Sequence, residues 1–119
     1  MSKGVLITIV EEEISPGQDI HGTIDIKYTG RFDSIVINSQ IENSNDIFNY
    51  TTLNGKKITY PYARLSISKD DIGTRKMLEF IATTKHVPAN ASSNAKFRVT
   101  IIQEHKEVAS DVAYIKIIK

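Results

Sequence analysis

The chain has 119 residues, no cysteine, 15 basic and 14 acidic residues, and a formal net charge of +1. These totals exclude disulfides, thiolate metal sites and cysteine nucleophiles, and a near-neutral surface gives no long-range attraction for nucleic acid or anionic lipid. The length predicts one domain over residues 1–119, large enough to bury a stable core without covalent cross-links. Because small secreted domains often carry disulfides, their absence favours a cytoplasmic location.

The first predicted strand lies near the start of the sequence. Val5, Ile7 and Ile9 fall on one face and Thr8 on the other, which is the period of a β-strand. The whole apolar run, residues 5–10, is too short to cross a membrane and lacks the cleavage site of a signal peptide. We therefore expect no membrane insertion.

The most distinctive stretch, residues 16–24, reads Pro-Gly-Gln-Asp-Ile-His-Gly-Thr-Ile. Pro16 presets φ at the second position of a turn, and Gly17 accepts the positive φ that follows. In the strand after this turn, Gly22 shares the core-facing side with Ile20 and Ile24. A glycine at such a place marks a bulge or lets a ring from the opposite sheet approach the backbone.

Alternation of apolar and polar side chains continues along the chain, and no stretch repeats apolar residues at helical spacing. Strands with one polar face belong to antiparallel sheets. The pattern predicts an all-β, immunoglobulin-like antiparallel β-sandwich of about seven to eight strands. Clear alternation after the first strand occurs at residues 20–28, 35–41, 78–82, 97–101 and 113–117.

Two local signals predict particular turns. Asn54-Gly55 favours a two-residue hairpin turn, because both residues tolerate positive φ. Residues 68–73 have the composition of one helical turn, for which Ser68 is the predicted N-terminal cap.

The alternating pattern breaks at Pro61. Apolar and aromatic residues occupy even positions up to Tyr62 and odd positions from Ala63 onward. One strand cannot keep both sets on the same face, so we expect a bulge or a change of sheet near Pro61. Proline also lacks an amide hydrogen, which places this segment at a sheet edge or divides it into two strands.

No motif predicts a catalytic or metal centre. His21, His86 and His105 have no second ligand at motif spacing, and we interpret all three as surface histidines. The sequence contains neither the serine elbow of hydrolases nor a phosphate-binding glycine loop. A catalytic triad can assemble from distant residues, which a sequence alone does not reveal. We expect no enzyme activity, no cofactor and no metal site.

The segment that begins at Pro16 resembles arrestin-like domains, which often read Pro-Gly-x-x-apolar-x-Gly-x-apolar early in the chain. Pro16, Gly17, Ile20, Gly22 and Ile24 fill those places. The later segments 78–80, 87–92 and 97–101 are similar to the strands and the proline-containing loop of that family. The resemblance implies one sandwich of the arrestin type, corresponding to half of a two-domain arrestin.

Our first functional hypothesis is a non-enzymatic adaptor-like module whose partner is a protein. Its predicted contact residues are Tyr60, Tyr62 and Arg64, because an edge strand accepts a partner strand and these residue types are frequent at interface hot spots. The tyrosines could instead cover the end of the sandwich. Two other functions stay open: a self-assembling or chaperone-like homodimer that buries its own edge, and a ligand-binding immunoglobulin-like module.

Overall fold

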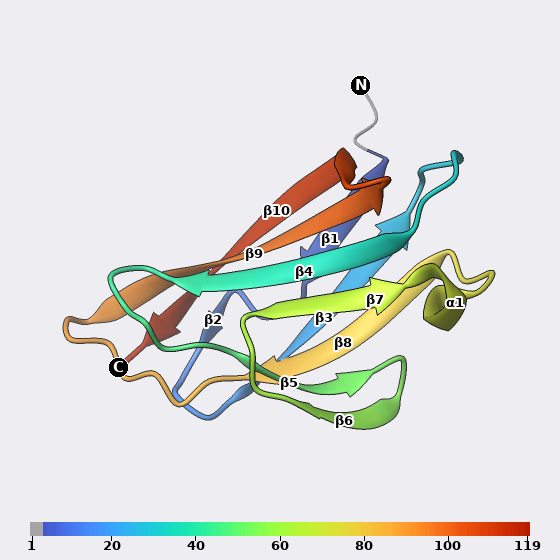
Figure 1. Ribbon diagram of the computed structural model, residues 1–119. Helices are drawn as coiled ribbons and strands as arrows, with labels where there is room; N and C mark the ends of the chain where they lie inside the picture. The colour runs from blue at the N-terminus through green and yellow to red at the C-terminus, as the bar shows by residue number, and fades with distance from the viewer. Residues whose placement is uncertain (1–3) are drawn as a thin grey trace.

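The computed structural model describes residues 4–119, which form two five-stranded sheets packed face to face (Figure 1). Sheet A contains, in spatial order, β1 (Val5–Ile9), β3 (Asp19–Ile26), β8 (Met77–Thr83), β5 (Asn49–Leu53) and β6 (Lys56–Tyr60). Sheet B contains β2 (Glu13–Ile14), β10 (Lys106–Ile118), β9 (Ser92–Gln103), β4 (Ser34–Ile41) and β7 (Arg64–Ser68). A single helical turn, α1 (Lys69–Ile72), follows β7.

The predicted all-β sandwich is confirmed, with two differences in detail. Residues 4–119 form ten strands, since β2 and β5 are short additions and the segment interrupted at Pro61 divides into β6 and β7. All strand pairs are antiparallel except β2 with β10, which are parallel. Among residues 4–119, no helix is long and apolar enough to cross a membrane.

The core lies between the sheets and follows the predicted alternation. In β3, β8 and β9 every second side chain is buried over most of the strand. Aromatic rings fill the middle of the core: Phe97 packs against Phe48 at 4.8 Å and against Phe80 at 5.9 Å between ring centroids, and Phe80 packs against Tyr50 at 5.9 Å. Burying several aromatic side chains supplies much of the hydrophobic stabilisation of such a domain.

The predicted turns are confirmed. Gln18 N donates to Ser15 O at 3.0 Å and Gly17 has φ +86°, which closes the turn around Pro16. Asn54 and Gly55 both have positive φ between β5 and β6.

The helical cap is confirmed as well. The Ser68 side chain accepts a hydrogen bond of 3.3 Å from the Asp71 amide at the start of α1. One of the first amides of the helix thereby gains a partner.

Gly22 faces the core as predicted, but the expected origin of the adjacent ring is wrong. The ring belongs to Phe80, which is the register partner of Gly22 in the neighbouring strand of the same sheet. Register between strands that are distant in sequence depends on the whole fold, so local alternation did not reveal this neighbour.

Candidate functional site: the open side of the sandwich

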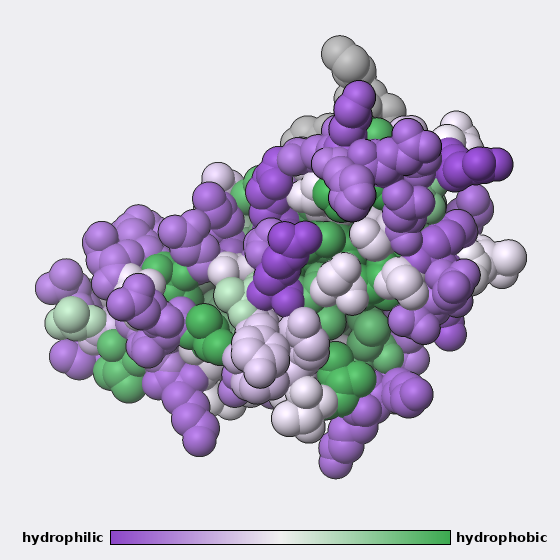
Figure 2. Space-filling model, in the orientation of Figure 1, coloured by the Kyte–Doolittle hydropathy of each residue, from purple (hydrophilic) through white to green (hydrophobic). Residues whose placement is uncertain are grey.

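The chain crosses from one sheet to the other at Pro61. β6 ends sheet A and β7 ends sheet B, and residues 61–63 join these two edge strands. The predicted change of sheet near Pro61 is therefore confirmed. We call the surface formed by β6, residues 61–63 and β7 the open side (Figure 1). In Figure 2, green and white residues reach the surface over the lower part of the visible face, in the region where Figure 1 draws β7 and the β5–β6 hairpin.

The three predicted contact residues all lie on the open side. Tyr60 ends β6, is half-buried and packs against the core, whereas Tyr62 in the crossover is 63% exposed. Their rings meet edge to face, with centroids 5.3 Å apart. Arg64 is exposed and begins β7 opposite Asn38. The role of Tyr60, Tyr62 and Arg64 in binding a partner stays a prediction.

The crossover is held by the carbonyl of Ala63. Its oxygen accepts hydrogen bonds from Ser39 N at 2.9 Å and from the Tyr50 hydroxyl at 3.3 Å. Burial raises the pKa of Tyr50 and outweighs the opposing hydrogen bond with Ser39, so the hydroxyl stays protonated and can donate. A fixed Ala63 sets the position at which β7 begins.

The hydrogen bonds at both ends of β7 show which of its backbone groups face outward. Ser39 N donates to Ala63 O, and Lys69 N donates to Asp33 O. The pairing between β4 and β7 is regular, so hydrogen-bonded pairs recur at every second residue and include Leu65 and Ile67. The N–H and C=O groups of Arg64 and Ser66 therefore point away from β4, on the side where sheet B has no further strand.

On the opposite side of the sandwich, which we call the closed side, a buried carboxylate binds the backbone of the edge strand. β1 is the other edge of sheet A, and it packs against β10 of sheet B. Ile7 N, which does not face β3, donates to Asp111 Oδ2 at 3.0 Å, and Asp111 is only 6% exposed. The edge of β1 is thus partly satisfied within the chain, and the edge of β7 is the better candidate for an external strand.

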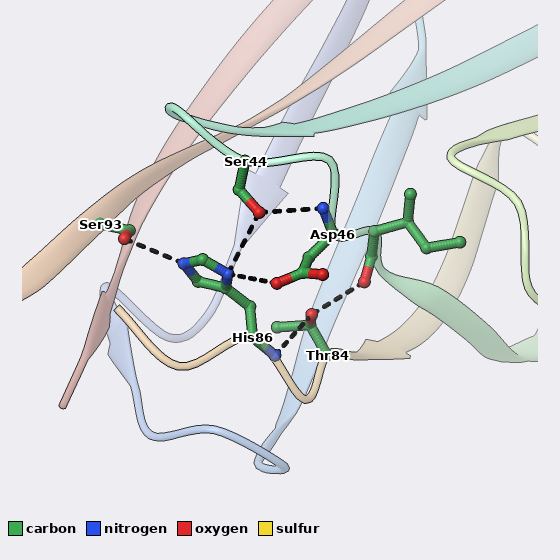
Figure 3. A network of polar contacts seen from close by, with 6 residues as sticks. Ser44, Asp46, Thr84, His86 and Ser93 are labelled. Carbon is green, nitrogen blue, oxygen red and sulfur yellow. Dashed lines mark hydrogen bonds and ion pairs between the residues drawn. The ribbon is translucent and has the colours of Figure 1, made fainter. Parts of the chain in front are cut away.

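A second cluster surrounds His86, which is not the surface residue that the sequence predicted. Its side chain is 8% exposed and lies between two loops and the start of β9 (Figure 3). His86 Nδ1 is 2.7 Å from Asp46 Oδ2 and Nε2 is 3.0 Å from Ser93 Oγ. Because a carboxylate only accepts, Nδ1–H donates to Asp46, and in the neutral ring Nε2 accepts from Ser93. Distances like these also occur in Asp-His-Ser catalytic triads.

The surroundings of this cluster favour a structural role. The hollow beside it, of about 330 Å³, is lined by Asp46 and His86 but not by Ser93. Ser93 has the parity of Ala95 and Phe97, both buried, so it points inward between the sheets. A nucleophile must meet its substrate, and here the accessible space lies on the carboxylate side of the ring.

The Asp46 carboxylate is the charged end of this cluster. Its hydrogen bond with the His86 ring is the main cause that lowers the pKa of Asp46, against a smaller opposing effect of desolvation; contacts with Ser44 add to the lowering. Ser44 Oγ also accepts from Asp46 N at 2.9 Å, and Thr84 Oγ1 donates to Ile47 O at 2.8 Å. The cluster therefore joins the β4–β5 loop to the β8–β9 loop.

His21 is at the surface, as predicted, with its side chain 54% exposed. Glu11 reaches it with both carboxylate oxygens: Oε1 accepts from His21 N at 2.7 Å and Oε2 is 2.6 Å from Nδ1. Partial burial raises the pKa of Glu11, but the hydrogen bonds from His21 lower it by more. His105 is also exposed. Among residues 4–119 no three His, Asp or Glu side chains gather as metal ligands.

No protein-family model and no curated protein matches the sequence. Solved structures with the same fold do exist. The enterotoxigenic E. coli adhesin CfaE is 10% identical at a TM-score of 0.60, over 97% of this chain and 48% of the adhesin, so the chain spans about half of that protein. A conjugative transposon lipoprotein from Bacteroides eggerthii is 12% identical at a TM-score of 0.55, over 98% of both chains.

A third similar structure is AvmM, which catalyses macrocyclization in alchivemycin A biosynthesis. It is 6% identical at a TM-score of 0.54, over 99% of this chain and 90% of AvmM. Identities this low show the β-sandwich fold alone, and one sandwich can carry unrelated functions. No arrestin stands among these similar structures, so the sandwich is confirmed and the arrestin-like resemblance is not.

Proposed function

We propose that the chain is a non-enzymatic interaction module that binds protein partners along the open side. The observation that carries this proposal is the outward direction of the Arg64 and Ser66 backbone groups at the edge of sheet B. An extended segment can add to such an edge through main-chain hydrogen bonds. Natural sheets usually cover or shorten their edges, so a regular edge strand of five residues calls for a partner.

The side chains around this edge support the proposal. Tyr62 offers an exposed aromatic ring, Tyr60 braces it edge to face, and Arg64 adds a guanidinium at the first residue of β7. Tyrosine and arginine are among the residue types enriched at interface hot spots, because both combine apolar contact area with hydrogen-bonding groups. These three residues are the ones we expect a partner to contact.

A homodimer through the same edge is the second candidate, because two copies of β7 could pair with each other. The like charge of the two Arg64 side chains opposes it, since self-pairing of β7 places both on the same face of the joined sheet. We also propose an arrestin-like type of sandwich and a cytoplasmic location. The arrestin-like resemblance rests on the Pro16 to Ile24 motif, and the cytoplasmic location rests on the absence of cysteine.

The proposed function can be tested by immobilising the protein and identifying the proteins that it recovers from native lysate. Two tyrosine variants are compared in this experiment. Tyr62→Ala removes an exposed ring on the open side, and Tyr114→Ala removes a ring of similar exposure, 71%, from the outer face of β10. We expect the recovery of specific partners to fall with Tyr62→Ala and to persist with Tyr114→Ala. Equal recovery by both variants would contradict a contact surface on the open side.

A further inference from the structure

We propose that the occupant of the open side is an extended segment in which apolar and acidic residues alternate, and that it adds to sheet B beside β7. This inference rests on the proposed function and goes further by naming the chemistry of the partner. Three features support it: the offset between the two sheets, the outward direction of the Arg64 and Ser66 backbone groups in β7, and the exposed basic residues of the open side.

The two sheets are offset so that β6 has no strand of sheet B above it. On the closed side, β1 packs against β10, and sheet B continues beyond β10 to β2. On the open side, the Tyr50 hydroxyl of β5 reaches Ile37 O of β4 at 3.5 Å and Ala63 O beside β7 at 3.3 Å. β5 therefore lies beneath the last strands of sheet B, and Figure 1 draws the β5–β6 hairpin below β7. One further strand beside β7 would cover β6.

The backbone of β7 is prepared for that strand. Arg64 and Ser66 each direct one N–H and one C=O away from β4. Neither side chain needs to move for a partner backbone to approach, because both point to the outer face while Leu65 and Ile67 point into the core. β6 is the poorer edge, since its pairing with β5 contains a register shift and Pro61 follows it directly.

An added strand would meet apolar side chains on its inner face. Ile58 and Tyr60 of β6 are half-buried and pack against the edge of the core. A strand above them would bury more of both side chains, and every second residue of that strand would face them. Apolar residues are therefore favoured at alternate positions of the partner.

The remaining positions of an added strand would lie on the outer face of sheet B, beside the exposed Arg64 side chain at the start of β7. No Asp or Glu occurs between Asp46 and Asp70, whereas Lys56, Lys57 and Arg64 in this interval are all exposed. Among residues 4–119 none of these three cations forms an ion pair. Acidic residues next to Arg64 gain attraction, and basic residues are repelled, so charge at the start of β7 selects an acidic partner and disfavours a second copy of this chain.

Short labelled peptides of alternating glutamate and valine, compared with peptides of alternating lysine and valine, test this inference. We expect the acidic peptide to bind, with affinity that falls as salt rises, and to slow amide exchange at Arg64 and Ser66. Arg64→Glu should weaken this binding by about tenfold, the scale of one close charge pair. Lys116→Glu, the same change of charge at an exposed residue of β10, should leave it unchanged.

Each other outcome has a distinct meaning. Equal binding of both peptides at Ser66 would overturn the acidic selectivity and leave the proposed function standing. If neither peptide slows exchange at Ser66, strand addition is overturned, and the comparison of Tyr62→Ala with Tyr114→Ala then decides the proposed function independently. Slowing of exchange that grows with protein concentration alone would identify a second copy as the occupant and would overturn the inference.

Discussion

The ring of Phe80 occupies the space that a side chain at Gly22 would fill. A Cβ built on Gly22 would lie 2.3 Å from Cζ of Phe80, far inside contact distance. The two residues are directly opposite each other in β3 and β8, and the ring continues from Gly22 into the core toward Phe97. The glycine in the most distinctive stretch of the sequence thus has a packing cause, and that stretch indicates a fold rather than an activity.

Gly22→Ala should destabilise the protein by roughly 1–3 kcal/mol, because the new methyl group forces the Phe80 ring out of its packed position. The free energy of unfolding from urea denaturation measures this effect. Phe80→Leu together with Gly22→Ala should recover part of the loss relative to the sum of the two single changes. A Gly22→Ala variant as stable as the original chain would show that the ring moves at no cost.

His86→Gln should lower the free energy of unfolding by about 1–3 kcal/mol, since it leaves partly buried partners such as Ser93 without a hydrogen bond. His105→Asn provides the control: His105 is exposed, and asparagine tolerates the positive φ of 66° at that position. We expect the control to change stability by no more than about 0.5 kcal/mol. Similar losses in both variants would contradict a buried structural role for His86.

Stability should fall in acid through two carboxylates. The pKa of Asp46 is lowered from 3.8, chiefly by the hydrogen bond with His86, and the pKa of Glu11 is lowered from 4.5 because hydrogen bonds from His21 outweigh the effect of burial. A group with a lowered folded-state pKa stabilises the fold above its ordinary pKa, and this contribution disappears as pH falls through the lowered value. The loss therefore lies below about pH 4.5 for Glu11 and below about pH 3.8 for Asp46.

Unfolding measurements from neutral pH down to about pH 2.5 check this dependence. Asp46→Asn should be less stable than the original chain at neutral pH, and the difference should shrink in acid. A difference that is constant across the whole range would mean that the Asp46 charge contributes nothing to the folded state.

Tyr50→Phe should destabilise the protein by about 1 kcal/mol, because the Ala63 carbonyl loses the hydroxyl donor that helps to hold the crossover. The core loses no ring, so the change isolates the hydrogen bond from the packing. Amide exchange at Ser39, whose N–H also binds Ala63 O, reports the local effect and should become faster. Unchanged exchange at Ser39 would show that the crossover does not depend on Tyr50.

Local rules predicted much of this fold. Alternation assigned the buried faces, Asn54-Gly55 identified a hairpin turn, Ser68 identified a helix cap, and the break in parity located the change of sheet at Pro61. Each of these features depends on residues that are close in sequence, where backbone preferences and side-chain period decide the structure.

Features that join distant segments could not be predicted in this way. His86 is buried because Asp46 from a loop and Ser93 from β9 satisfy both ring nitrogens. No spacing in the sequence indicates that these three residues lie together. The order of strands is equally non-local. Only the edge position of β6 and β7 followed from a local signal, the proline at position 61, and the role of Tyr60, Tyr62 and Arg64 as contact residues remains a prediction.

Amide hydrogen exchange along β7 in the free protein, measured residue by residue by NMR, tests the central claim that this edge is open. An open edge predicts slow exchange at Leu65 and Ile67, whose N–H groups face β4, and fast exchange at Arg64 and Ser66, whose N–H groups face outward. Slow exchange at all four residues in the monomer would show that the edge is already covered, and it would contradict the proposed site.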